Sequence, residues 1–136
     1  MIRRRIPDKF KAQSMILAAQ AEIKFTKTIV PTAESSFTIV RNIYESFRML
    51  GDALLLIHGK EASEKGHHIE MINELLTLNV ETKRPIQVLL NLKDLRNKIN
   101  YNGYLPTVEE AKDALSILDA CFEPIINKVK EELQKL

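Results

Sequence analysis

Apolar residues recur along most of the chain at spacings of three and four, which is the period of one face of an α-helix. In residues 8–30 this repeat is carried by Ala12, Ile16, Ala19 and Ile23. Asp8 is a suitable N-cap, and Pro31 cannot continue a helix. The pattern therefore predicts a first helix over residues 8–30.

A second apolar stripe follows almost at once, after a possible cap at Thr32. Its members are Ile39, Ile43, Phe47, Leu50, Leu54 and Ile57. Gly51 interrupts good helix formers at a cost of roughly 1 kcal/mol, which indicates a close approach of another helix. Gly59 suits the end of this helix. Residues 59–66 are predicted to be an exposed loop, and residues 67–78 a short helix.

The fourth predicted helix begins near Pro85, carries Val88, Leu92, Leu95 and Ile99 on one face, and ends at the Asn102-Gly103 turn signal. The fifth begins at a capping box, in which the Thr107 hydroxyl and the Glu110 carboxylate each bond a backbone N–H. Its apolar stripe comprises Ala111, Leu115, Leu118, Phe122, Ile125, Val129 and Leu133. Pro124 is expected to kink it.

Helices with one apolar face and short connections bury those faces by packing together. We therefore expect one all-α domain over residues 1–136: an antiparallel up-and-down helical bundle of four long helices plus one short helix. The length of the last helix leaves open that it also serves a dimer interface.

Composition narrows the class of protein. No apolar run approaches the roughly 18 residues of a membrane span, and residues 1–5 are basic without the apolar region of a signal peptide. The single cysteine, Cys121, excludes an internal disulfide and is expected to be buried. A disulfide-free chain fits a reducing cytosol, so we expect a cytoplasmic protein without membrane contact.

Charge is unevenly distributed, although the net charge is only +2. Residues 1–30 hold seven basic and two acidic residues, and residues 82–100 hold five basic and one acidic residue. A basic side could attract phosphate. The alternative is an ordinary solvated surface of mixed charge. Glu64 and His67 have the Glu-x-x-His spacing of a di-iron ligand pair but occur only once, so neither a metal nor a cofactor is expected.

The most unusual segment is residues 92–104. Arg96 lies only about 40° from Leu92 around a helix, at the border of the apolar stripe. From such a border an arginine can lay its stem on the core and bind phosphate with its guanidinium. The equally open alternative is a structural arginine paired with a carboxylate. The candidate phosphate-binding residues are Lys93, Arg96, Asn97 and Asn100.

Arg96-Asn97, with Tyr104 trailing, resembles the signature of the HEPN family (higher eukaryote and prokaryote nucleotide-binding domains). A second similarity is residues 53–59 followed by a polar loop and Gly66-His67-His68. The resemblance spans about residues 8–135. It implies a homodimer with arginine and histidine of both subunits in one cleft, often a metal-independent endoribonuclease toxin. It also implies a nucleotidyltransferase antitoxin as partner, and Tyr104 as a possible site of nucleotide modification.

This chain departs from the signature because Tyr101 occupies the histidine position. Tyrosine, with a pKa near 10, is a poor general base at neutral pH. The candidate catalytic residues are therefore Arg96 and Tyr101, with His67 or His68 as a substitute base if the fold brings one near. The sequence favours a nucleotide- or RNA-phosphate-binding domain with weak or no ribonuclease activity. It leaves open an active endoribonuclease toxin and a non-catalytic helical adaptor.

Overall fold

The computed structural model describes residues 2–4, 6–62 and 67–136, and helix α2 (Ser36–Ile57) forms the centre of the fold. Fifteen of the 22 residues of α2 are buried, so this helix has no fully solvated face. It contacts α1 (Lys9–Thr26), α3 (His67–Leu76), α4 (Val88–Asn102) and α5 (Val108–Gln134). The all-α class predicted from the hydrophobic period is confirmed.

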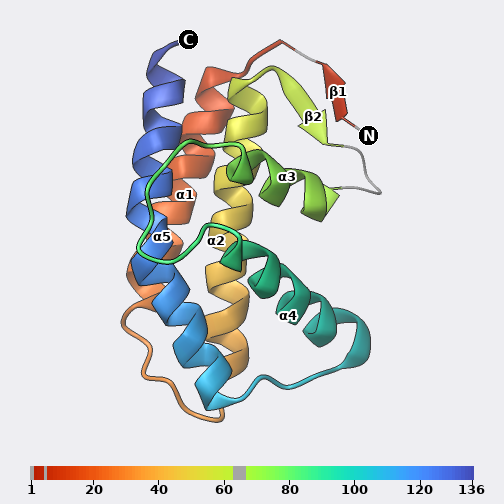
Figure 1. Cartoon of the computed structure of the whole chain (residues 1–136), viewed down its shortest axis with the longest axis vertical. Coiled ribbons are helices and arrows are strands. Elements are labelled where there is room, and N and C mark those ends of the chain that lie inside the picture. Colours follow the sequence, from red (N-terminus) through yellow and green to blue (C-terminus); the bar gives the residue numbers. More distant parts are fainter. Residues whose placement is uncertain (1, 5, 63–66) are drawn as a thin grey trace.

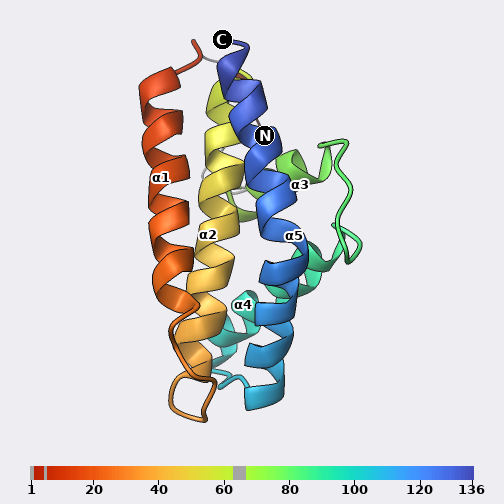
Figure 2. The ribbon, with the colours of Figure 1, turned by 90° about the vertical axis from the view of Figure 1, so that its left-hand side faces the viewer.

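The long helices α1, α2 and α5 lie side by side, whereas α3 and α4 lie obliquely against α2 (Figures 1 and 2). Helix α1 runs opposite to α2, as expected. Helix α5, however, runs in the same direction as α2, so the predicted up-and-down order does not hold for this pair. The reason is that α3, α4 and the residues between them together return the chain to the beginning of α2.

The connection between α3 and α4 is held against α5. The Lys83 backbone N–H donates to the Ala120 carbonyl at 3.2 Å. One guanidinium nitrogen of Arg84 lies 2.8 Å from a carboxylate oxygen of Asp113 and 3.2 Å from the Ser116 hydroxyl. These contacts hold residues 83 and 84 on the surface of α5.

The helix ends largely follow local sequence signals. Asp8 caps α1 by accepting from the Lys11 N–H at 3.0 Å, and both halves of the Thr107–Glu110 capping box are formed. Gly59 and Gly103 adopt positive φ values of 68° and 63° just beyond α2 and α4. The predicted start of α2 near Thr32 is early, because residues 33–35 form a turn before the helix begins at Ser36.

The loop prediction for residues 59–66 is wrong in part. Residues 2–4 (β1, Ile2–Arg4) pair antiparallel with residues 60–62 (β2, Lys60–Ala62), and the remaining residues 63–66 lie outside the described part. Two three-residue strands far apart in the sequence have no alternation long enough to predict. They tie the start of the described chain to the end of α2.

Gly51 marks a close helix approach, as predicted. A Cβ atom at this position would lie 2.4 Å from the carbonyl oxygen of Met71 in α3. Only glycine therefore lets the α3 backbone rest directly on α2 here. Cys121 is fully buried in α5, and this burial raises the pKa of its thiol.

Candidate functional site

Arg96 lies on α4 at the contact with α2, and its side chain is only 15% exposed. The guanidinium carbon is 5.9 Å from the centre of the Tyr44 ring, within range of a cation–π interaction. One terminal nitrogen, Nη2, is 3.8 Å from a carboxylate oxygen of Glu45. Its position at the edge of the buried core agrees with the border position expected from the helical period.

Two of the three Arg96 nitrogens, Nε and Nη1, are covered and have no hydrogen-bond partner. Buried donors are almost always paired, and leaving one unpaired costs about 1–3 kcal/mol. The ion pair with Glu45 is long and uses the remaining nitrogen. Arg96 therefore pairs with a carboxylate, as the structural alternative expects, but two of its nitrogens have no hydrogen-bond partner.

On the α2 side, Glu45 is shared between two arginines. Its other carboxylate oxygen accepts a hydrogen bond from Arg48 Nε at 2.7 Å. Arg48 also pairs with Asp52 at 3.2 Å and lies 3.8 Å from the sulfur of Met71. The tighter Arg48 contact holds Glu45 in place, so Arg96 faces a fixed carboxylate.

The ring of Tyr44 lies against the Arg96 guanidinium and is fully buried. Burial, together with the charge of Glu45, raises the pKa of Tyr44 to about 12, although Arg48 and Arg96 act in the opposite direction. The ring is thus neutral at physiological pH and offers an apolar, polarisable face to the arginine.

The other candidate phosphate-binding residues lie on the same side of α4 but differ in exposure. Lys93 is largely covered, with its ammonium 3.4 Å from Asp94, while Asn97 is half-buried and Asn100 is exposed. They lie roughly 40–100° from Arg96 around the helix. The structure therefore gathers them beside Arg96 along one face, from covered to solvated.

The two tyrosines after Arg96 occupy different settings. Tyr101 is 76% exposed at the end of α4. The Tyr104 hydroxyl donates to Glu110 at 2.6 Å, and this hydrogen bond raises the Tyr104 pKa. The ammonium of Lys98 lies 4.6 Å from the centre of the Tyr104 ring. Tyr104 thus joins the end of α4 to the capping box of α5.

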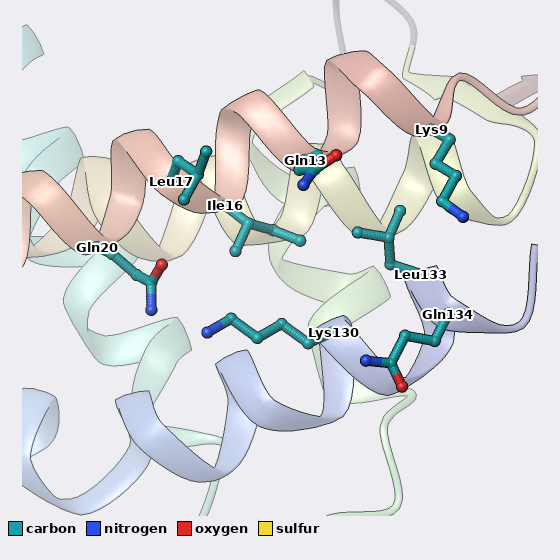
Figure 3. A pocket seen from close by; sticks show the side chains of 8 residues that line it. All are labelled: Lys9, Gln13, Ile16, Leu17, Gln20, Lys130, Leu133 and Gln134. Atoms are coloured by element: carbon teal, nitrogen blue, oxygen red, sulfur yellow. The ribbon is translucent and has the colours of Figure 1, made fainter.

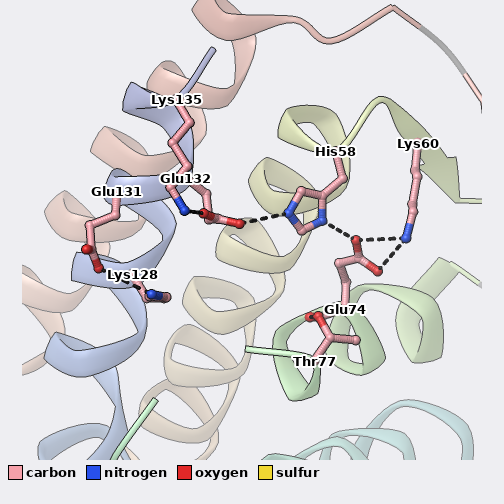
Figure 4. A network of polar contacts seen from close by, with 8 residues as sticks. All are labelled: His58, Lys60, Glu74, Thr77, Lys128, Glu131, Glu132 and Lys135. Carbon is pink, nitrogen blue, oxygen red and sulfur yellow. Dashed lines mark hydrogen bonds and ion pairs between the residues drawn. The ribbon is translucent and has the colours of Figure 1, made fainter. Parts of the chain in front are cut away.

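No described histidine side chain reaches Arg96. His58 follows α2, about 20 Å along the helix axis from Glu45. Its Nδ1 is 2.6 Å from Glu74 on α3 and its Nε2 is 3.4 Å from Glu132 on α5, as Figure 4 shows. The side chains of His67 and His68, the proposed substitute base, lie outside the described part.

The His58 contacts form a polar link between helix ends. Glu74 is 5% exposed and also pairs with Lys60 at 3.3 Å (Figure 4). Hydrogen bonds from Lys135, and secondarily from His58, lower the pKa of Glu132. Every nitrogen of the His58 ring faces a carboxylate, so this cluster joins α2, α3 and α5 rather than presenting a free base.

A groove of about 310 Å³ lies between α1 and α5 (Figure 3). Its apolar lining comes from Ile16, Leu17 and Leu133, and Lys9 and Lys130 extend along it. It is separate from the Arg96 region, because α1 and α4 lie on different sides of α2 in both views of the ribbon.

Three of the five basic residues in the segment 82–100 lie near a carboxylate. These residues are Arg84, Lys93 and Arg96, and Lys98 lies over a tyrosine ring.

Within the described part of the chain, no three side chains of the metal-binding types come together. None of the helices described has an apolar stretch of the length and hydrophobicity that a membrane span requires.

Sequence reasoning missed the α2 half of the site. This half consists of Tyr44, Glu45 and Arg48, which in the sequence look like ordinary residues of an amphipathic helix. Only the packing of α4 on α2 brings them close to Arg96. The signal that could have found them is the polar pair Glu45 and Arg48, one turn apart beside a buried tyrosine.

The fold and site define an all-α protein with a partly unsatisfied arginine between two helices. Comparison of the chain with protein-family models, with curated proteins and with solved structures gives no match.

Proposed function

We propose that this chain is a HEPN-like domain that binds nucleotide or RNA phosphate through Arg96 and has weak or no ribonuclease activity. The observation that carries the proposal is the pair of covered Arg96 nitrogens without partners. Phosphate oxygens are the ligands that best match a guanidinium. A phosphate at Arg96 would supply the missing acceptors.

Glu45 is the internal competitor for that phosphate. It holds one Arg96 nitrogen at 3.8 Å and is itself anchored by Arg48. Because Nε and Nη1 are covered, the Arg96 side chain must turn outward, away from Glu45, to meet a ligand. Lys93, Asn97 and Asn100 lie on the side of α4 toward which it would turn, and their donors would add to the site.

The test is the affinity for ATP and for a short fluorescein-labelled single-stranded RNA, measured by anisotropy at fixed salt. Arg96→Ala should weaken binding by about 10- to 100-fold, the equivalent of losing charge-assisted hydrogen bonds. Glu45→Gln should strengthen binding several-fold because it removes the competing charge. Opposite effects at two neighbouring residues would not arise from a general loss of stability.

Arg84→Ala is the matched control. Arg84 is also paired with a helix carboxylate, Asp113, but it lies in the connection between α3 and α4 and contacts α5, whereas Arg96 contacts α2. Its replacement should leave binding unchanged. Equal affinity of the parent and Arg96→Ala for both ligands would refute the proposal, and a protein partner retained by Arg96→Ala would favour the adaptor function.

The same preparations, incubated with transfer RNA in chelator, test the ribonuclease alternative. Tyr101 is exposed at the position where the family signature has a histidine, and a tyrosine side chain is a poor general base at neutral pH, so we expect no cleavage. Cleavage that requires both Arg96 and Tyr101 would instead assign an active endoribonuclease. A homodimer and a nucleotidyltransferase partner belong to this proposal as implications of the HEPN resemblance.

A further inference from the structure

Helix α1 carries a second apolar face that the bundle does not cover. Phe10, Leu17 and Phe25 are 84%, 59% and 60% exposed. At 100° per residue they fall within about 80° of one another, on the opposite side from the buried face. That buried face consists of Ala12, Ile16, Ala19, Ile23 and Thr26. Exposed apolar residues that share one helix face can form an interaction surface.

The exposed stripe is symmetric about its own centre. Phe10 and Phe25 each lie about 11 Å along the helix axis from the point between Leu17 and Ala18. If two α1 helices meet antiparallel across a two-fold axis at that point, Phe10 of each copy faces Phe25 of the other. Such a self-complementary surface is the requirement for a two-fold dimer.

The residues around this stripe fit the same arrangement. Ser14 and Ala21, also equally spaced from the centre, are small and exposed, so two helix backbones can approach closely there. Ile6 and Val30, beyond the two ends of α1, are exposed apolar residues placed almost symmetrically about the same point. The five large apolar residues exposed between positions 6 and 30 thus form one nearly palindromic set.

Charges along the stripe are complementary in this arrangement. Lys11 and Glu22 lie on the same flank of the stripe, about 20° apart around the helix. In antiparallel helix pairs each flank meets the same flank of the partner. Lys11 of each copy therefore faces Glu22 of the other copy, which gives two equivalent charge pairs. On the opposite flank, Gln13 and Gln20 face each other, and Lys24 lies near the partner's Gln13.

The groove between α1 and α5 adjoins this stripe, because Leu17 belongs to both (Figure 3). It extends the apolar area that a second copy can cover. Leu17 therefore lies at the centre of the candidate interface.

We propose that α1 binds α1 of a second copy in antiparallel orientation, with the two-fold axis between Leu17 and Ala18. This goes beyond the phosphate-binding proposal and differs from the dimer that the HEPN resemblance implies. Since α4 lies on another side of α2 from α1, each subunit keeps its own Arg96 site outside the interface.

Sedimentation equilibrium of the full chain over a wide concentration range tests the interface. The parent should dimerise reversibly, and Leu17→Glu should weaken association at least about tenfold, as expected for a charge placed at the centre of an interface. Leu105→Glu, at an equally apolar residue that is 76% exposed between α4 and α5, is the matched control and should dimerise like the parent. Circular dichroism of each variant checks that it is folded like the parent.

Two further variant sets test the orientation. Lys11→Glu and Glu22→Lys should each weaken the dimer, and their combination should restore it. A mixture of Ser14→Cys and Ala21→Cys chains should form an intermolecular disulfide that neither chain forms alone, because only the antiparallel arrangement brings these positions level. Cys121 is fully buried and does not compete.

A parent that stays monomeric at the highest concentration would overturn the proposal, as would a dimer unaffected by Leu17→Glu. A disulfide from Ser14→Cys chains alone would replace the antiparallel arrangement with another. Phosphate affinity provides a separate readout: Leu17→Glu should bind RNA as the parent does at its Arg96 site, so failure of one proposal does not imply failure of the other.

Discussion

Gly51→Ala tests the packing that supports the candidate site. The new methyl would lie 2.4 Å from the Met71 carbonyl oxygen and 2.8 Å from its carbon, against about 3.4 Å for ordinary contact. Because these are backbone atoms of α3, the whole helix must move by about 1 Å. Overpacking of this kind typically costs about 1–3 kcal/mol.

Two terms then set the net effect. The backbone contact places the steric cost near the upper value of about 3 kcal/mol. Alanine gains about 1 kcal/mol over glycine in a helix. We therefore expect the free energy of unfolding to fall by about 2 kcal/mol, which corresponds to a decrease in Tm of roughly 6–10 °C in a chain of this size.

Urea denaturation followed by circular dichroism measures this change. Asn127→Ala, at an exposed position of α5, is the control and should change stability by less than about 0.5 kcal/mol. A Gly51→Ala protein at least as stable as the parent would refute the close approach of α3. The approach matters for function because Met71 also contacts Arg48, which holds Glu45 beside Arg96.

Three other perturbations have definite outcomes. His58→Ala should lower the free energy of unfolding by about 1–3 kcal/mol in urea titrations, because Glu74 is almost fully buried and loses its shortest hydrogen bond. Native Cys121 should not react with a thiol reagent until denaturant is added, since burial raises its pKa and blocks access. Burial acts to raise the pKa of Glu110, but hydrogen bonds from Tyr104 and the capping residue outweigh it and lower that pKa. Ionised Glu110 therefore stabilises the fold at pH values above the ordinary glutamate pKa of 4.5. This stability should be lost as the pH falls through the lower pKa that Glu110 has in the folded protein. Tyr104→Phe should reduce that loss in acid denaturation curves, because it removes the hydrogen bond that the Tyr104 hydroxyl donates to Glu110.

Local signals predicted the local structure well. The capping box at Thr107, the end of α4 at Gly103 and the buried face of α1 each depend on residues within a few positions of one another. Each is encoded by a side chain and its own helix, so no knowledge of packing was required. The same holds for the border position of Arg96 on α4.

Long-range features could not be predicted in this way. The pairing of β1 with β2 joins segments more than fifty residues apart, and the parallel course of α2 and α5 depends on how α3 and α4 cross between them. The contacts of Arg96 with Tyr44 and Glu45 are of the same kind. The outer face of α1 was present in the sequence at Phe10, Leu17 and Phe25, but the stronger inner stripe concealed it.

The central position of α2 has a consequence for motion within the protein. Because α1, α3, α4 and α5 cover different faces of α2, the opening of any one of them still leaves most of α2 shielded. Its backbone amides should exchange with solvent hydrogen only when the whole chain unfolds, whereas α3 and α4 can open separately. Tyr44 and Glu45 thus belong to the slowest-exchanging helix, and Arg96, on the more readily opened α4, is the part of the site that can move.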